Sequence, residues 1–436
     1  MGRQLGGTAR MSTQSGPTET NTQPGSSRPL VEGRQALWLG LLAALVAGAV
    51  LCGYEMLRSS ANTLFVQEYG KQALPWALGL TLVGVTLLTF IYGRLLSWLG
   101  PRHTLQATTA LAILTMVASW GAIRLGLRPA LIVLFIFKES YVVLLIEQIW
   151  SYIDSTLEPK AAKRLNGPIC GVAGIGAVAG GLLLGKLSQP LGTQSMLLLA
   201  AAATLLTLPL LQLLFAKFGA PTEGKKKQSE KGHLALHLFR TEPVLLLLIS
   251  LIASTQVLST ILELAFKSAL QDHLPVADVQ NAYSGNYYAL VNFAAMFFQF
   301  IGAPLLLSVF PGRVIHILVP LCNLLALGYM LWAPPLIGSA VAYGVFKTLD
   351  YSLFRAAKEL LYVPLPFDAR YRAKEVIDVL GNRVSKGMAS LLVTLLQFAH
   401  VVFSQLAYAG VGIVAVGLWL GLALPLSRAA QKEQAE

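Results

Sequence analysis

Apolar runs long enough to cross a bilayer recur twelve times along this chain of 436 residues. An α-helix needs about 20 predominantly apolar residues to span the hydrocarbon core. The chain is 55% hydrophobic and only 12% charged, whereas a soluble domain has about 25% charged residues. The sequence therefore predicts an all-α membrane protein with about twelve transmembrane helices. These helices are expected to begin near Ala36, Leu74, Thr104, Pro129, Leu165, Gln194, Pro243, Tyr283, Val314, Pro335, Glu375 and Gln405.

A polar stretch in the middle of the chain leaves six apolar runs on each side. The halves share short patterns, such as Phe137-Lys138 and Phe346-Lys347 in the fourth run of each half. Two six-helix pseudo-repeats around a site near the bilayer midplane resemble the architecture of major-facilitator-like transporters. The predicted divisions are a disordered cytoplasmic tail over residues 1–34, an N-terminal six-helix bundle over 35–215, a cytoplasmic linker over 216–241, a C-terminal six-helix bundle over 242–427 and a cytoplasmic tail over 428–436.

The placement of cations between the apolar runs predicts the orientation of the chain. Placing the N-terminus inside puts Arg94, Arg164, Arg313 and the central Lys225–Lys227 run on the cytoplasmic side. Cytoplasmic loops of membrane proteins carry an excess of Lys and Arg. We therefore expect a multi-pass protein of the inner (plasma) membrane with both termini in the cytoplasm. Much of the net charge of +12 follows from this bias, so it does not indicate a nucleic-acid partner.

Charged side chains interrupt several of the most apolar runs. Lys138 and Glu139 lie inside one run, Lys347 lies at the corresponding place in the other half, and Glu263 and Lys267 end a third run. A bare charge at the bilayer centre costs about 2.5–3.5 kcal/mol on insertion scales, so such residues normally face a polar cavity. Because most of these residues are cations, they favour a bundle that holds an anion while it crosses the membrane.

Two stretches of the second half resemble a known family. Residues 263–293 contain an acidic residue, a Lys four positions later and then Asn-Ala-Tyr-Ser before an aromatic segment. Residues 351–387 contain Tyr-Ser-Leu-Phe, Lys-Glu-Leu-Leu-Tyr, Ala-Lys, Ile-Asp and a Gly-to-Lys spacing in that order. Together they resemble the nucleotide transporter family, the ATP/ADP translocases of plastids and intracellular bacteria. The resemblance implies import or exchange of a nucleotide by alternating access.

The resemblance also implies roles for individual residues. The matched positions are Glu263 and Lys267 in the seventh run, Lys358, Glu359 and Tyr362 in the Lys-Glu-x-x-Tyr motif, the Lys374–Asp378 pair, Lys386, and Arg58 as the cation of the first run. Three positions depart from the family pattern. Gln271 replaces a second Lys, Ser59 replaces an acidic residue, and Asp154 is only an approximate counterpart of a family acid. Because of these departures, the substrate could be another nucleotide or another phosphorylated anion.

The chemistry of phosphate binding supports the same set of residues. A nucleoside di- or triphosphate brings about three or four negative charges, and unpaired buried charge is very costly. Lys supplies a point charge, while Arg supplies a fork suited to phosphate. The predicted substrate-binding residues are Arg58, Lys138, Lys267, Lys347, Lys358, Arg383 and Lys386. The predicted coupling or gating residues are Glu263, Asp154, Glu359, Lys374 and Asp378. Tyr287 and Tyr288 are candidates for stacking on a base.

Glu263 lies one helical turn before Lys267, so the two side chains can pair when the site is empty. A phosphate would then displace Glu263, which would force exchange.

Two alternatives stay open at this point. One is a major-facilitator-type carrier of another anion, with proton coupling as one form of it, because architecture alone does not fix the substrate. The other is a membrane enzyme or scaffold, but the chain offers no nucleophile–base arrangement for a reaction. Its histidines are scattered without ligand spacing, so we expect neither a metal site nor a cofactor. The expected partners are a nucleotide and the lipid bilayer, with no requirement for an oligomer.

Overall fold

The computed structural model describes residues 30–219, 243–362, 377 and 381–435. These residues are almost entirely helical, with a single isolated bridge between Val31 and Leu157, which confirms the all-α fold class. The longer helices are α1 (Gly33–Tyr69), α2 (Leu74–Arg124), α3 (Pro129–Thr156), α4 (Pro159–Leu191), α8 (Pro243–His273), α9 (Ala277–Phe297), α11 (Gly312–Trp332) and α15 (Gln405–Ala435). The shorter ones are α5 (Met196–Leu205), α6 (Thr207–Phe218), α10 (Ala303–Val309), α12 (Pro335–Leu349), α13 (Arg355–Tyr362) and α14 (Asn382–Phe398).

The helices account for the apolar runs of the sequence. In the described ranges, nine helical segments are each long and apolar enough to cross a membrane. One of these segments contains α2, which bends at Gly100, where φ is 69° and ψ is 170°, and continues from Pro101. That segment therefore provides two of the predicted spans. Two further spans are α14 and the segment formed by α12, the π-helical turn η4 (Asp350–Phe354) and α13. The predicted start of the eleventh span near Glu375 falls outside the described residues.

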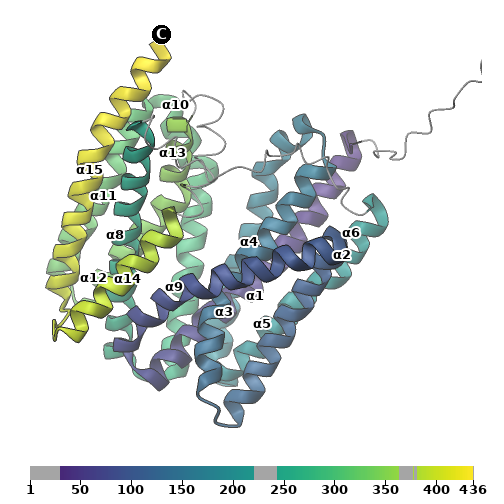
Figure 1. Ribbon diagram of the computed structural model, residues 1–436, viewed down its shortest axis with the longest axis horizontal. Helices are drawn as coiled ribbons and strands as arrows, with labels where there is room; N and C mark the ends of the chain where they lie inside the picture. Colours follow the sequence, from purple (N-terminus) through teal and green to yellow (C-terminus); the bar gives the residue numbers. More distant parts are fainter. Residues whose placement is uncertain (1–29, 220–242, 363–376, 378–380, 436) are drawn as a thin grey trace, which may run out of the picture.

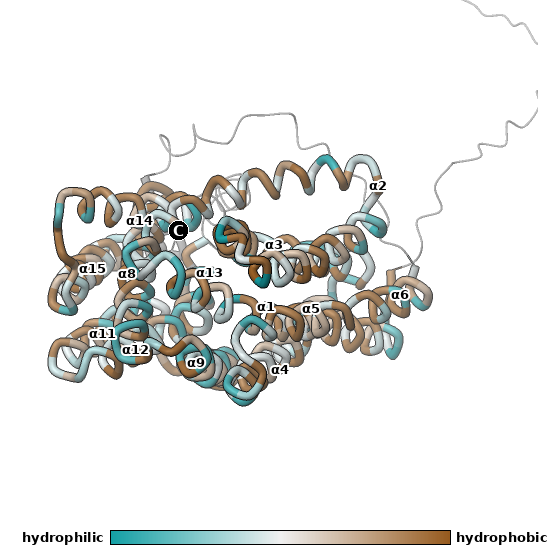
Figure 2. Tube along the Cα trace, turned by 90° about the horizontal axis from the view of Figure 1, so that it is seen from below, coloured by the Kyte–Doolittle hydropathy of each residue, from teal (hydrophilic) through white to brown (hydrophobic). Residues whose placement is uncertain are grey.

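The helices form two groups that follow the order of the chain (Figure 1). Helices α1–α6 make up the N-terminal group, and helices α8–α15 make up the C-terminal group. The groups meet along two seams, one where α4 and α1 contact α9 and the other where α2 contacts α14. Figure 2 shows these seams on opposite sides of the molecule. The domain boundaries predicted at residues 215 and 242 stay a prediction.

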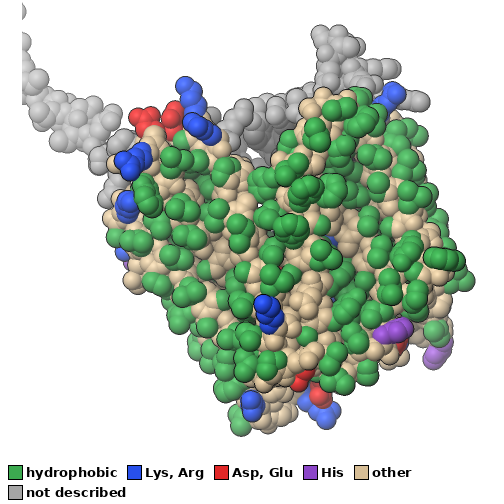
Figure 3. All heavy atoms as spheres, turned by 180° about the vertical axis from the view of Figure 1, so that it is seen from behind, with side chains coloured by type: hydrophobic (Ala, Val, Ile, Leu, Met, Phe, Trp, Pro, Cys, Tyr) green, Lys and Arg blue, Asp and Glu red, His purple; other side chains and the backbone are tan. Residues whose placement is uncertain are grey.

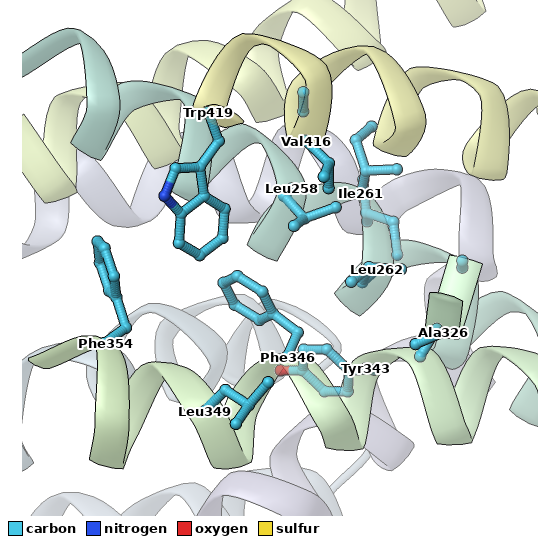
Figure 4. Packing of buried hydrophobic residues seen from close by; sticks show 14 of the residues in the cluster. Leu258, Ile261, Leu262, Ala326, Tyr343, Phe346, Leu349, Phe354, Val416 and Trp419 are labelled. Atoms are coloured by element: carbon cyan, nitrogen blue, oxygen red, sulfur yellow. The ribbon is translucent and has the colours of Figure 1, made fainter. Parts of the chain in front are cut away.

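The buried apolar residues form two clusters. One lies within the N-terminal group and includes Leu39 and Leu134. The other is built mainly from the C-terminal group, with Phe346 and Trp419, and extends to Phe135 of α3. Figure 4 shows Phe346 facing Leu258 and Trp419 across the second cluster. The outer surface is also apolar, and on the face drawn in Figure 3 most charged side chains lie toward the two ends. This distribution fits a protein surrounded by lipid along its middle.

The termini end is where α1 begins and α15 ends, and the far end is where α1 and α8 end (Figure 1). At the far half of the seam between α4 and α9, backbones touch at Gly181 and Gly285. A Cβ atom on Gly181 would lie 2.8 Å from the Gly285 carbonyl oxygen. Glycine at this contact therefore allows the two groups to approach closely.

Candidate functional site

Most of the charged residues predicted inside the bundle meet where the two helix groups face each other. We call this set the charge cluster. It contains five cations and three carboxylates among the described residues: Arg58 and Glu55 on α1, Lys138 and Glu139 on α3, Glu263 and Lys267 on α8, Lys347 on α12, and Lys386 on α14. Glu55, Lys138, Glu263 and Lys267 are buried, while the others are partly exposed.

A chain of alternating charges runs through the cluster from one helix group to the other. Lys138 Nζ lies 2.6 Å from Glu139 Oε1, and Glu139 Oε2 lies 3.8 Å from Lys386 Nζ. Lys386 Nζ lies 3.2 Å from Glu263 Oε2, and Glu263 Oε1 lies 2.6 Å from Lys267 Nζ. Each carboxylate thus bridges two lysines, and Lys386 is shared by an acid from each group. The chain ends at Asn62 of α1, whose Oδ1 accepts a hydrogen bond of 3.2 Å from Lys267.

Arg58 is held between a carboxylate and two aromatic rings. Its guanidinium forms an ion pair with Glu55, one turn earlier on α1. The guanidinium carbon lies 3.7 Å from the centre of the Tyr288 ring of α9 and 5.3 Å from that of Tyr54. A cation over an aromatic face is stabilised by the ring quadrupole, most strongly where water is excluded. Arg58 is therefore fixed by residues from both helix groups.

The two candidate base-stacking residues belong to an aromatic cluster on α8, α9 and α12. Tyr287 stacks on Phe266 with ring centres 4.4 Å apart, and its hydroxyl donates a hydrogen bond of 2.9 Å to the Ala340 carbonyl. Tyr288 lies edge-on to both Phe266 and Tyr287 and holds Arg58 on one face. A base would have to displace these neighbours to stack here, and the stacking role stays a prediction.

The other predicted residues are not members of the chain of alternating charges. Lys358 and Glu359 are on α13, and Arg383 is on α14 one turn before Lys386. Asp154 is exposed near the end of α3, about 24 Å along the helix axis from Lys138 at 1.5 Å per residue. Lys374 and Asp378 lie outside the described residues. The roles predicted for these residues stay predictions.

The structure adds four polar residues that the sequence reasoning did not select for the site. Glu55 and Glu139 were visible as acids in apolar runs, each near a cation of its own helix, but nothing in the sequence connected Glu139 to Lys386. Asn62 and Ser259 carry no such signal, because a single amide or hydroxyl in an apolar helix is usually satisfied by its own backbone. Here Asn62 binds Lys267, and Ser259 lies 3.3 Å from Lys347.

At the far end, polar contacts join the two helix groups. Lys71 Nζ lies 2.5 Å from Asp272, and Gln67 Nε2 donates a 2.6 Å hydrogen bond to the Pro275 carbonyl. The Thr193 hydroxyl lies 2.7 Å from Asp278 Oδ1. The two groups diverge toward the termini end (Figure 1). The charge cluster is thus separated from the far end by a layer of contacts between the groups.

No metal is suggested by the ligand types present. In the part of the chain that the structure describes, no group of three or more His, Cys, Asp or Glu side chains is placed to hold an ion. The chemistry of the charge cluster is that of reversible ion pairing: lysines that can bind phosphate oxygens, and carboxylates that can occupy those lysines when phosphate is absent.

Comparison with known proteins gives one family and several relatives. The sequence model of the Major Facilitator Superfamily matches residues 43–354. A plastidic ATP/ADP-transporter of Solanum tuberosum is 23% identical over 233 residues, which cover 47% of this chain and 36% of that protein. ADP,ATP carrier protein 3 of Rickettsia felis is 20% identical, over 91% of this chain and 95% of that protein. These relatives confirm the resemblance to ATP/ADP translocases.

The first of these relatives is much longer than its matched part, so this chain spans little more than a third of its length. Among solved structures, the nucleoside transporter NupG superposes with a TM-score of 0.64 at 13% identity, covering 90% of this chain and 99% of that chain. At this level of identity the likeness establishes the fold alone.

Proposed function

Because the chain belongs to the Major Facilitator Superfamily, we propose that it is a carrier, not an enzyme, and that it moves nucleotides such as ATP and ADP across the membrane. The observation that carries this proposal is the largely buried chain of three lysines and two glutamates between the helix groups. A cluster this rich in cations is costly to bury without an anion. Relatives named as ATP/ADP carriers support a nucleotide as that anion.

Alternating access is the expected mode of transport. In the conformation described here, contacts such as Lys71–Asp272 join the groups at the far end. We propose that the termini end faces the cytoplasm of the inner membrane and that substrate enters from there. Rocking of one group against the other would open the far end, as in other carriers built from two repeats. The ion pair between Glu139 and Lys386, which joins the two groups within the charge cluster, would have to break during this rocking.

Exchange follows from the pairing of the lysines. Without substrate, Glu263 bridges Lys267 and Lys386, and Glu139 bridges Lys138 and Lys386. Bound phosphates would displace these carboxylates and take over their lysines. An intermediate with neither substrate nor carboxylate on these lysines would leave several buried charges unpaired, which is strongly unfavourable. The carrier would therefore return only with a second substrate bound, which couples import to export.

Uptake of labelled ATP into proteoliposomes tests this function directly. Vesicles preloaded with ADP would be compared with empty vesicles, for the wild type, Lys267→Ala and the control Lys217→Ala. Lys217 is exposed on α6, over the Trp38 ring. Uptake that requires internal ADP and is lost only in Lys267→Ala is the expected result. Absence of uptake by folded protein under every nucleotide loading would instead favour a carrier of another anion.

A further inference from the structure

Lys347 differs from the other cations of the charge cluster. Arg58, Lys138, Lys267 and Lys386 each form an ion pair with a carboxylate. Among the described residues Lys347 forms none, and its polar partner is the Ser259 hydroxyl at 3.3 Å. Its Nζ also lies 5.0 Å from the centre of the Tyr351 ring. Asp350, one helical turn after Lys347, acts on it at longer range than an ion pair. An anion can thus reach Lys347 without first breaking an ion pair.

Ser259 places this cation in line with the pairs on α8. Ser259, Glu263 and Lys267 follow one another at intervals of four residues, so they lie on one face of the helix, about 6 Å apart along its axis. Ser259 is the member nearest the termini end, because α8 runs from that end to the far end. Lys347 therefore lies on the termini side of the Lys267–Glu263–Lys386 group.

The serine hydroxyl is suited to share in anion binding. Its oxygen accepts from the Lys347 ammonium, and its own hydrogen stays available to donate to a phosphate oxygen. Ser259 is 2% exposed, so a hydrogen bond made there is shielded from water. The ammonium group has two further hydrogens for the same phosphate.

We propose that Lys347 and Ser259 form a separate subsite that takes the first phosphate group of the substrate, while Lys267 and Lys386 take the further phosphates by displacing Glu263. This proposal rests on the proposed function. It divides recognition into two steps: capture of any monophosphate at Lys347, followed by selection for a longer phosphate chain. The first step leaves the carboxylate bridges intact, so a nucleoside monophosphate binds without enabling transport.

Binding of AMP, ADP and ATP to the purified full-length protein tests the division. Ser259→Ala should weaken all three by about tenfold, the usual loss for a hydrogen bond to a charged group. Lys347→Gln should weaken all three by at least tenfold, on the same basis, and Lys347→Arg should restore AMP binding. Lys267→Gln should leave AMP within about threefold of the wild type and weaken ADP and ATP by at least tenfold.

Ser254→Ala is the matched control, because Ser254 is buried on the same helix and its hydroxyl is bonded only to the Leu251 carbonyl. Affinities unchanged in this control show that losing a buried serine on α8 does not by itself weaken binding. The inference is overturned if Lys347→Gln and Ser259→Ala bind AMP like the wild type, or if Lys267→Gln loses AMP as strongly as ATP. Those results leave nucleotide transport intact as a function. A wild type that binds none of the three nucleotides overturns both.

Discussion

The two helix groups contribute to the charge cluster in different ways. In the N-terminal group every cation has an acid of its own, Glu55 for Arg58 and Glu139 for Lys138, so its share of the cluster is neutral. The C-terminal group supplies Lys267, Lys347 and Lys386, but only Glu263 forms ion pairs with them, and Asp350 lies one helical turn after Lys347. Cations therefore outnumber acids on this side.

This difference suggests a division of labour. The N-terminal group contributes paired charges with no net charge. The C-terminal group supplies most of the electrostatic attraction for an anion. Lys386 connects them, because it takes part of its compensation from Glu139 of the other group. Substitutions on the two sides should therefore have unequal effects.

Lys386→Ala should have the largest effect on transport. It removes the cation shared by Glu139 and Glu263 and leaves these two acids facing each other without it. Removing one partner of a buried pair costs about 3–5 kcal/mol, so ATP uptake into ADP-loaded vesicles should fall by at least about 100-fold. Lys217→Ala, with an exposed cation removed, serves as the control. Uptake within a few fold of the wild type would show that the connection is not needed.

Lys138→Met should act on stability more than any change at Lys347. Lys138 is fully buried, and its loss leaves Glu139 with Lys386 alone, at 3.8 Å. The expected loss of unfolding free energy is about 3–5 kcal/mol, followed as the thermal midpoint of the purified protein. The double variant Lys138→Met/Glu139→Leu should regain most of the loss. Lys347→Met should not lower the midpoint, and an equal loss there would remove the distinction between the two sides.

Glu263→Gln should make the return of the empty carrier slower still. The neutral amide fills the space but no longer compensates Lys267 and Lys386, so the empty carrier would have to return with these two lysines lacking that acid. Efflux of preloaded ADP into nucleotide-free buffer should therefore fall by about tenfold, the loss expected for one hydrogen bond to a charged group. Glu68→Gln, at an acid paired with Arg128 on the surface, should leave efflux unchanged. If Glu263→Gln also leaves it unchanged, the coupling lies elsewhere.

Lys71→Ala should have the smallest effect. Its ion pair with Asp272 is partly exposed, and such pairs contribute about 0.2–1 kcal/mol. Opening at the far end should become more frequent by less than about fivefold. The readout is labelling of a Gln280→Cys variant by an impermeant maleimide, with the three native cysteines replaced. A much larger increase would make this pair the main contact of the far end.

The spans could be predicted from sequence because bilayer crossing depends on local composition. Apolar length alone gave the starts of α2, α3 and α15, and it separated the two arms of α2 at Gly100-Pro101, where the helix bends. The π-helical turns at Phe298–Gly302 and Asp350–Phe354 were not predicted. Such turns insert one residue into a helix without changing its hydropathy, so they cannot be predicted from amino-acid composition.

The site could be predicted only in part, for a physical reason. Lysines in apolar runs stand out by their desolvation cost, so Lys138, Lys267 and Lys347 were found. The pair of Lys267 with Glu263 also follows from their spacing. The bridge from Glu139 to Lys386 does not, because it joins distant parts of the chain and depends on how the two groups pack. The same holds for Tyr288, which suggested base stacking in the sequence but lies against Arg58 in the structure.

The contact of Gly181 with Gly285 has a mechanical consequence. Where two helices interlock through large side chains, one can turn past the other only if rotamers change together, and this resists motion in steps. Bare backbones present a nearly smooth surface instead. The two helix groups can thus tilt about the seam between α4 and α9 without a change of side-chain rotamers there. A single methyl group added at Gly181 would clash with the Gly285 backbone and hinder this tilt.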